Sequence, residues 1–483
     1  MHYKAFLKTT SALLVVGAGL MTIPATCAWI YDEGDFAAFA WTILGSVLLG
    51  GPTFFLLRSK QRMSVKEEFV LVVIGWLLIT AVSSIPFVLH GAIPSFTDAF
   101  FEVMSGYTTT GSTLQTDIEA LPKVLLFWRN MTHFIGGMGM IVLYLTLFSG
   151  AGSTRLVRAE AAPGQGLTGV KMLPRLQETL RWLWVIYVGL NVVATLIFWA
   201  GGMSLYDALI HASSAVATGG FSSRNASFGH FNSAYLDWMV ILFMFIGGMD
   251  FVLHFQLISR NWEEVWNNTE IKAYLGVVMV LCVGVSWFLW ESGTYASIAE
   301  ACRYGFFQVV SIITTTGFAT ADYELWPHTS QILIFLCLFI GASSSSTTSG
   351  IRIIHLVIIW RSISHTARTL LQPMAVNPIQ INRRPLPPVI INGVVAFFTL
   401  HILCLLLGSV LLTFLDPRDF WSSLNAVMAT LWNNGPAFST VGPTDNFSHF
   451  SDPATWLLSF AMLAGRLDLY TVLIFFFPSF WRS

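Results

Sequence analysis

Long apolar segments that carry almost no charge constrain this chain more than any other feature. They lie near residues 37–57, 67–90, 124–149, 182–200, 236–258, 273–290, 331–341, 389–415 and 456–478. Only 11% of the 483 residues are charged, whereas a typical soluble domain has about 25%. A helix needs about 20 apolar residues to cross the hydrocarbon core of a bilayer, so most of these segments are long enough to span it. The sequence therefore predicts an all-α polytopic membrane protein.

The N-terminal 28 residues fit two interpretations. Lys4 and Lys8, an apolar run and the small residues Ala25–Ala28 are typical of a cleavable signal peptide. The same residues fit a first membrane helix that is followed by an acidic external turn at 31–35. We favour the membrane helix, which places the N-terminus in the cytoplasm.

Basic residues gather in four of the connections between apolar segments. These are Arg58, Lys60, Arg62 and Lys66; Arg155, Arg158, Lys171, Arg175 and Arg181; Arg260 and Lys272; and Arg361, Arg368, Arg383 and Arg384. The positive-inside rule makes these connections cytoplasmic and the alternate ones external. The net charge of −1 argues against a nucleic-acid partner. Since the chain has no Walker sequence, we expect any nucleotide regulation to come from a separate subunit.

Four polar segments centred on glycine interrupt the apolar pattern, all on the predicted external side. Two carry the sequence TTTG, at Thr108–Ser112 and Thr314–Phe318, and looser versions stand at Ala217–Phe221 and Asn433–Pro436. A polar segment that returns four times in an apolar chain suggests four quarters of one pore.

A short helix is expected before each of these segments, at Thr97–Tyr107, Ser204–Val216, Ser297–Ile313 and Asp419–Leu431. Three have a capping residue with an acid, namely Thr97 with Asp98, Ser204 with Asp207, and Asp416 with Asp419. At ~1.5 Å per residue, ~11–13 residues reach only ~16–20 Å, which is too short for ~30 Å of hydrocarbon. We therefore expect re-entrant half-helices. Non-helical backbone at membrane depth persists only where protein buries it or where it lines a cavity.

The chemistry of a bare cation explains why such segments suit a pore. The ion must exchange its hydration shell for other oxygens, which rings of backbone carbonyls can supply. Glycine permits the torsions that aim carbonyls inward, threonine hydroxyls add oxygens, and the negative ends of the half-helices favour a cation. Small residues that merely pack helices are the alternative for any single segment. The predicted ion-filter residues are Thr109, Thr110, Gly111, Thr218, Gly219, Thr315, Thr316, Gly317, Asn433, Asn434 and Gly435.

Two further features lie inside apolar segments. Gly341–Gly350, rich in serine and threonine, interrupts what would otherwise be one helix from Gln331 to Trp360. It is either a kink or hairpin between two short helices, or a flexible loop under the pore. Arg466 lies within the last apolar segment, where a buried arginine is costly and must face partners or a cavity.

The chain resembles a known family in several motifs. They are Thr108–Ser112 followed by Phe134–Met140 (FIGGMGM), Gly219–Ser222 followed by Ile246–Asp250 (IGGMD), Phe306–Val310 (FFQVV) before Thr314–Phe318, Asn433–Pro436 (NNGP), Gly465–Tyr470 (GRLDLY) and Phe480–Arg482 (FWR). Over essentially its whole length, the chain resembles the TrkH-type subunit of the Trk/Ktr/HKT superfamily of potassium transporters.

The resemblance implies four covalently linked membrane–pore-helix–membrane repeats around one pore. The corresponding ranges are 63–150, 151–262, 263–370 (with a broken second helix) and 371–483, after a two-helix N-terminal extension at 1–62. It also implies a multi-pass protein of the bacterial inner membrane that takes up K⁺ without an organic cofactor. The implied partners are a second copy in a homodimer, membrane lipids and a cytosolic nucleotide-binding ring of the TrkA type.

The resemblance also assigns roles to residues. Gly111, Gly219, Gly317 and Gly435 match the filter glycines, and Arg466 matches an arginine that faces the gate beneath the filter. The implied gate residues are Gly341, Ser343, Ser344, Ser345, Ser346 and Gly350. The chain departs from the family pattern in its serine-rich rather than glycine-rich gate loop, and in having Asn433 and Asn434 where two other segments have threonines. We therefore expect an oxygen ring without four-fold equivalence and a moderate preference for K⁺ over Na⁺.

Alternative functions remain open from the residues alone. A symporter coupled to H⁺ or Na⁺ needs a midplane acid, for which Asp250 and Asp468 are the candidates. An intramembrane serine protease could use Ser343–Ser346 as nucleophile and His355 as base, but no GxSxG motif surrounds these serines. A membrane scaffold would leave the four aligned segments without a purpose. We expect a transporter and no enzyme, with no catalytic residue.

Overall fold

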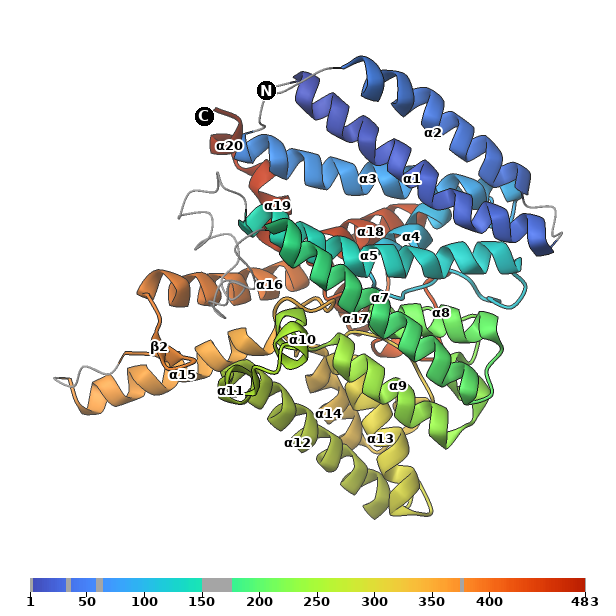
Figure 1. The fold of residues 1–483 in the computed structure, drawn as a ribbon. Helices are drawn as coiled ribbons and strands as arrows, with labels where there is room; N and C mark the ends of the chain where they lie inside the picture. The colour runs from blue at the N-terminus through green and yellow to red at the C-terminus, as the bar shows by residue number, and fades with distance from the viewer. Residues whose placement is uncertain (1–2, 32–35, 58–63, 150–175, 374–377, 483) are drawn as a thin grey trace.

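The computed structural model describes residues 3–31, 36–57, 64–149, 176–373 and 378–482. This part of the chain is almost entirely helical. Its two strands, β1 (Gln380–Ile381) and β2 (Arg384–Pro385), form one short antiparallel hairpin. The C-terminal end of helix α15 (Ile353–Leu371) projects from the rest of the molecule (Figure 1). Ile381 of the hairpin is buried in one cluster with Ile354 and Ile358 of this helix.

Six of the described helices are long and apolar enough to cross a membrane. They are α1 (Tyr3–Tyr31), α2 (Phe36–Leu56), α3 (Val65–His90), α7 (Leu176–Ala200), α12 (Thr269–Glu291) and α16 (Pro388–Leu415). Helix α5 (Lys123–Ser149) is of similar length. The predicted all-α membrane architecture is confirmed for the described residues.

Two predicted spans are broken rather than continuous. The segment 236–258 forms α9 (Ala234–Gly247) and α10 (Phe251–Ile258), which meet at an angle of 100°. The segment 456–478 forms α18 (Asp452–Arg466) and then α19 (Leu469–Leu473), with a bend of 118°. An aspartate stands at each break: the carboxylate of Asp250 caps α10, and Asp468 has a positive φ of 62°. The predicted interruption of the seventh apolar segment is present, between α14 (His328–Leu338) and α15.

Four short helices lie where the sequence places them. They are α4 (Phe96–Tyr107), α8 (Leu205–Val216), α13 (Ile298–Ile313) and α17 (Phe420–Leu431). Each begins with a side-chain oxygen that accepts a backbone N–H three residues later, from Ser95, Ser204, Ser297 and Asp419 respectively. The predicted caps at Thr97 and Asp416 are wrong, because Thr97 lies inside α4 and Asp419 itself caps α17.

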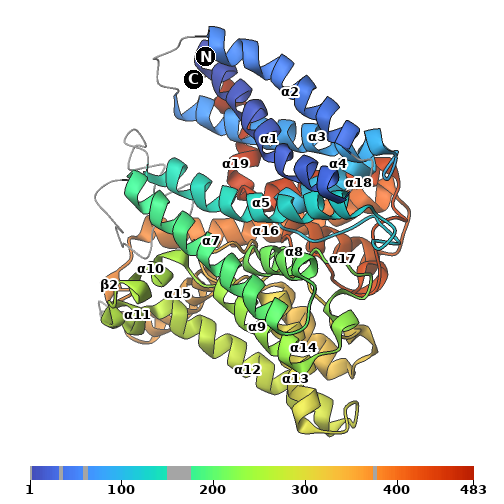
Figure 2. The ribbon, with the colours of Figure 1, turned by 45° about the vertical axis from the view of Figure 1, so that its right-hand side comes forward.

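The N-terminal helices form a separate layer on one edge of the molecule. α1 and α2 lie side by side and cover α3, as both views show (Figures 1 and 2). Met21 and Ala25 of α1 and Phe39 of α2 are buried in one cluster with Trp128 of α5. The remaining short elements are α11 (Trp262–Asn267), α20 (Pro478–Arg482), η1 (Ser227–Phe231), η2 (Tyr323–Leu325), η3 (Ser439–Val441) and η4 (Ile474–Phe476).

Candidate functional site

The four short helices end in the same backbone turn. We call these turns segment 1 (Thr108–Gly111), segment 2 (Ala217–Gly220), segment 3 (Thr314–Gly317) and segment 4 (Trp432–Gly435). The second residue of each segment is left-handed, with φ of 49°, 53°, 51° and 53° at Thr109, Thr218, Thr315 and Asn433. The fourth residue is a glycine with φ of 84°, 84°, 80° and 81° at Gly111, Gly220, Gly317 and Gly435.

Backbone hydrogen bonds explain how threonine persists in a left-handed conformation that glycine usually fills. In each segment the third residue donates its N–H to the carbonyl five residues earlier, for example Thr110 to Ser105 (2.9 Å) and Gly219 to Ser214 (2.8 Å). The second residue donates to the carbonyl three residues earlier, as from Thr109 to Gly106 (3.0 Å). This is the Schellman arrangement of a helix C-terminus. Because the helix end imposes the turn, it holds the strained torsion in place.

The structure corrects the predicted register of segment 2. The sequence pattern places Gly219 beside Gly111, Gly317 and Gly435. The backbone instead makes Gly220 their equivalent, since Gly220 carries the positive φ and Gly219 does not. Gly219 takes the third position, which Thr110 occupies in segment 1.

The segments close into a ring in the order of the chain. A methyl group added at Gly111 would come within 3.0 Å of the carbonyl oxygen of Gly219, and one at Gly220 would reach that of Thr316. In the same way, Gly317 abuts the carbonyl oxygen of Asn434, and Gly435 that of Thr110. Each glycine thus lies against the third-position carbonyl of the next segment, and segment 4 returns to segment 1. This contact leaves no room for a side chain at the glycine.

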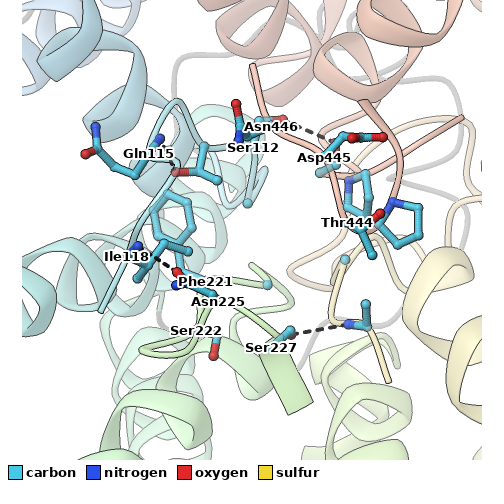
Figure 3. Close-up of a pocket in the computed structure, with 18 of the residues that line it drawn as sticks. Ser112, Gln115, Ile118, Phe221, Ser222, Asn225, Ser227, Thr444, Asp445 and Asn446 are labelled. Atoms are coloured by element: carbon cyan, nitrogen blue, oxygen red, sulfur yellow. Dashed lines mark hydrogen bonds between the residues drawn. The ribbon is translucent and has the colours of Figure 1, made fainter. Parts of the chain in front are cut away.

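A cavity of about 160 Å³ lies on one side of this ring. Its lining includes the four glycines, and Figure 3 shows Ser112, Phe221, Asn225 and Asp445 around it. Two arginines also line it, and both are paired. Arg129 donates to Glu102 (2.6 Å) and Arg224 to Asp207 (3.1 Å). Their positive charges are therefore balanced where a cation would enter.

The loops that follow the segments bind one another around the cavity. Ile118 donates its backbone N–H to the side chain of Asn225, which joins the loops after segments 1 and 2 (Figure 3). The other junctions are Ala319 to Ser227 (3.3 Å), Tyr323 to the carbonyl of Ala437 (2.5 Å) and Phe447 to the carbonyl of Thr113 (2.8 Å). All four junctions of the ring are thus hydrogen-bonded.

The chain between α14 and α15 lies against the opposite side of the ring. We call residues 341–350 the intramembrane loop. The hydroxyls of Thr347 and Thr218 share a hydrogen bond (2.9 Å), and Ser349 donates its N–H to the hydroxyl of Thr315 (3.4 Å). The loop therefore contacts the second residues of segments 2 and 3. The segments stand between it and the cavity.

A carboxylate fixes the other part of the intramembrane loop. Glu270 of α12 accepts hydrogen bonds from the backbone N–H (2.5 Å) and the hydroxyl (2.8 Å) of Ser344. Ser343 donates its N–H to the carbonyl of Gly248 (3.0 Å), at the break between α9 and α10. The loop is thus a structured element that contacts three parts of the fold.

Arg466 meets the intramembrane loop, as the sequence predicts for a buried arginine. Its guanidinium donates to the carbonyl of Thr347 (2.5 Å), to the hydroxyl of Ser349 (3.1 Å) and to the carbonyl of Gly136 in α5 (3.3 Å). The side chain is 1% exposed. All of these acceptors are neutral, so the guanidinium is held by hydrogen bonds to the intramembrane loop and to α5 rather than by an ion pair with them.

Three residues proposed for other functions have structural partners. Asp250, a candidate acid of the symporter hypothesis, uses its carboxylate to accept the N–H of Val252 and so caps the start of α10 (2.8 Å). The Ser344 hydroxyl donates to Glu270, and the Ser346 hydroxyl to the carbonyl of Ser343 (2.6 Å). These two serines of the protease hypothesis are therefore bonded within the loop.

Sequence reasoning missed four residues of the site: Glu102, Arg129, His133 and Glu270. Three of them carry charge inside or at the edge of apolar helices. The criterion that singled out Arg466, a charge at membrane depth, applies equally to Glu102 and Arg129. His133 had no such signal, because a buried histidine in an apolar helix is usually a packed core residue.

Comparison with known proteins gives a consistent result. Residues 36–483 match the family model TrkH, described as a cation transport protein. The chain is 36% identical to the Trk system potassium uptake protein TrkH of Escherichia coli (strain K12), over 100% of both chains. It is 30% identical to TrkG of the same strain, covering 96% of this chain and 95% of the relative. The crystal structure of the potassium transporter TrkH from Vibrio parahaemolyticus matches with a TM-score of 0.91, 31% identity and complete coverage of both chains.

Proposed function

The chain belongs to the TrkH family of cation transport proteins, and from that membership we propose that it carries K⁺ into the cell across the bacterial inner membrane. The full-length similarity to potassium uptake proteins supports the choice of ion. We further propose that the units 63–150, 151–262, 263–370 and 371–483 are the four repeats of one pore. The shared caps and the shared turn after each short helix support this division.

The closed ring of the four segments is the observation that carries the proposal. We assign the ion filter to Thr109, Thr110, Gly111, Thr218, Gly219, Gly220, Thr315, Thr316, Gly317, Asn433, Asn434 and Gly435. A dehydrated cation needs several oxygens at similar distances, and a ring of backbone carbonyls can provide them. The helix ends that precede the segments carry partial negative charge, which favours a cation there.

The intramembrane loop and Arg466 form the gate in this proposal. The loop closes the side of the ring opposite the cavity, and the arginine adds a positive charge that repels K⁺. Opening requires the loop to leave Thr218 and Thr315 and to release Arg466. The hydroxyls of Ser344 and Ser346 donate hydrogen bonds that strengthen the closed position of the loop, so Ser344→Gly and Ser346→Gly should raise ion flux.

A homodimer and a cytosolic nucleotide-binding ring of the TrkA type are the partners we propose. The basic stretches Arg155–Lys171 and Arg361–Arg384 are the predicted docking surfaces for the ring, and the first of these lies outside the described residues. In the second, Arg384 lies in β2 of the hairpin, and Arg361 donates to the carbonyl of Gln380 in β1. Charge reversal there should weaken co-purification of the ring in a salt-sensitive way.

Flux into liposomes that contain the purified chain tests the function. We expect K⁺ flux down its gradient without a requirement for a pH gradient. Gly317→Ser should lower K⁺/Na⁺ discrimination, because the added side chain meets Asn434 and Pro436 of the next segment. Arg466→Ala should raise flux while keeping discrimination. Flux that depends strictly on a pH gradient would favour the symporter, and unchanged discrimination in Gly317→Ser would refute the filter.

A further inference from the structure

The four segments share a backbone but differ in the side chains that stabilise it. In segments 1 and 3, the first and third residues are threonines whose hydroxyls share a hydrogen bond of 2.7 Å. These pairs are Thr108 with Thr110 and Thr314 with Thr316. Segment 2 has Ala217 and Gly219 at these two positions, so it lacks both hydroxyls.

The ring of His133 occupies the space that a side chain at position 219 would fill. A methyl group built on Gly219 would lie within 3.0 Å of three atoms of this imidazole. Gly219 does not have a positive φ, so its backbone would accept any residue. The histidine is therefore the reason that position 219 must be glycine.

His133 is held through the edge of its ring that faces Gly219, because Nδ1 is the imidazole atom nearest to a methyl group built there (2.4 Å). Its Nδ1 is hydrogen-bonded to the hydroxyl of Ser214 (2.8 Å), and Ser214 is also the residue whose carbonyl accepts the N–H of Gly219. The imidazole thus links α5 to the end of α8 and is fully buried.

A stack of three side chains leads from the cavity to this histidine. The imidazole lies flat on the ring of Phe221, with centroids 4.1 Å apart and an interplanar angle of 19°. The guanidinium carbon of Arg129 lies 3.4 Å from the centroid of the same phenylalanine. Arg129 also donates to the carbonyl of Ser222 (3.2 Å) and is held by Glu102 of α4. Two side chains of α5 therefore contact the chain on either side of Gly220: His133 lies beside Gly219, and Arg129 lies beside Phe221 and Ser222.

We propose that His133 is a positioning residue that determines ion specificity in segment 2. Its imidazole replaces the threonine pair of segments 1 and 3 and holds the carbonyl of Gly219 in the ring, next to Gly111. Arg129 and Phe221 keep the imidazole in place. This inference rests on the filter proposed above.

The first test removes the imidazole. In liposomes containing the full chain, His133→Ala should lower K⁺/Na⁺ discrimination by roughly tenfold, because a loosened carbonyl ring no longer prefers the larger ion. Bi-ionic flux gives the discrimination, and the K⁺-dependent rise in unfolding temperature gives binding independently of the gate. His401→Ala is the matched control, since His401 is also buried against a phenylalanine but is bonded to Phe397 of its own helix. It should leave discrimination unchanged.

The second test replaces the imidazole of His133 with the threonine side chains that stabilise segments 1 and 3. Gly219→Thr alone should damage ion binding, because its side chain collides with the imidazole. The triple variant His133→Ala with Ala217→Thr and Gly219→Thr gives segment 2 the threonine pair of segments 1 and 3 and should recover most of the discrimination. If His133→Ala does not fold, His133→Asn retains a hydrogen-bonding group near Ser214 and should give an intermediate loss.

Parallel measurement of Gly317→Ser separates the two proposals. If Gly317→Ser loses discrimination while His133→Ala, or His133→Asn in its place, keeps it, the role of His133 is refuted and the filter stands. If neither changes discrimination, the filter assignment itself fails. A loss in His133→Ala that the triple variant does not recover would also overturn the proposed exchange of the imidazole for a threonine pair.

Discussion

Hydrogen bonds between side chains of the same turn stabilise segments 1 and 3, whereas contacts with other parts of the fold stabilise segments 2 and 4. The hydroxyl pairs of segments 1 and 3 lie within the turn. Segment 2 depends on His133, and segment 4 uses the Asn433 amide, which donates to Thr110 of segment 1 (2.8 Å) and to the carbonyl of Met462 (2.9 Å). Yet the second residues of all four segments have nearly the same φ, between 49° and 53°.

This difference shows that the backbone and the side chains have separate roles in the ring. The Schellman hydrogen bonds are common to the four segments and set the shape of the turn. The side chains differ, so they stabilise that shape without defining it. Segments 2 and 4 should therefore respond to changes far from them in sequence, and segments 1 and 3 mainly to changes within the turn.

The largest loss of stability is expected when the buried ion pair between Arg129 and Glu102, which lies beside segment 2, is broken. Replacing Arg129 with Ala, or Glu102 with Gln, leaves one buried group without its partner, which costs about 3–5 kcal/mol in typical proteins. The exposed fractions of the two side chains are 2% and 0%. Unfolding temperature in detergent should fall in both single variants.

A double variant provides the control for this pair. Glu102→Gln with Arg129→Met removes both charges and should be less destabilised than either single variant, because no unpaired charge remains. Destabilisation that is fully additive in the double variant would show that the two side chains act independently.

A smaller loss of stability is expected when the threonine hydroxyl at the third position of a segment is removed. Thr110→Val loses the bonds to Thr108 and Asn433, whereas Thr316→Val loses only the bond to Thr314. At about 1 kcal/mol for each side-chain hydrogen bond, Thr110→Val should be about twice as destabilising as Thr316→Val. Chemical or thermal unfolding measures this. Equal effects would mean that the bond from segment 4 to segment 1 contributes no stability.

Removing the contact between segment 2 and the intramembrane loop should change the K⁺ flux more than it changes the stability of the chain. Thr218→Val removes the hydrogen bond to Thr347, and its loss should weaken the closed loop by about 1 kcal/mol or less. The expected result is a several-fold higher K⁺ flux with an unfolding temperature close to that of the unmodified chain. Thr109→Val is the matched change in segment 1, and flux that rises as much in Thr109→Val would contradict a specific role for the loop contact.

The smallest expected effect is a change in the pH dependence of stability at the contact between the loops that follow segments 3 and 4. Glu324, in η2, accepts the backbone N–H of Ser439 (2.5 Å). Burial raises the pKa of this carboxyl; the charges of Asp322 and Asp445 add to the rise, and the bond from Ser439 opposes it. A raised pKa in the folded chain means that its contribution to stability is present below the unfolded pKa of ~4.3 and is lost as pH rises through the folded pKa.

The free energy of unfolding, measured as a function of pH, tests the direction of this effect. Between the ordinary carboxyl range and neutrality, the unmodified chain should lose slightly more stability with rising pH than Glu324→Gln does. A steeper loss in Glu324→Gln would show that the bond to Ser439 outweighs burial.

Much of the site was predictable because it depends on local sequence. Each short helix is followed directly by its turn, so a polar, glycine-centred segment after a short apolar helix is visible without the fold. The cost of burying a charge predicted that Arg466 faces partners or a cavity, and the family resemblance implied that it faces the interrupting loop. The hydrogen bonds to Thr347 and Ser349 agree. The broken spans at 248–250 and 467–468 were missed because apolar composition continues across each break.

The register of segment 2 shows where local sequence was insufficient. Two adjacent glycines, Gly219 and Gly220, are equally compatible with a left-handed turn. The helix-end hydrogen bonds and the neighbouring carbonyls assign the positive φ to Gly220, while the imidazole of His133 requires glycine at 219. The helix-end hydrogen bonds are local, but the neighbouring carbonyls lie in other segments and the imidazole lies within α5, all remote in sequence from segment 2.

The sequence by itself determined that this chain is an apolar helical membrane protein with four short helices, each leading into a polar turn. Hydrophobic length and helix-end chemistry are local properties, and they suffice for those features. Only the tertiary structure decided which atoms face one another: the carbonyl of each segment against the next glycine, the imidazole behind segment 2 and the loop beneath the ring. Such contacts depend on packing at distances of a few ångströms between remote parts of the chain, and short-range sequence patterns do not encode them.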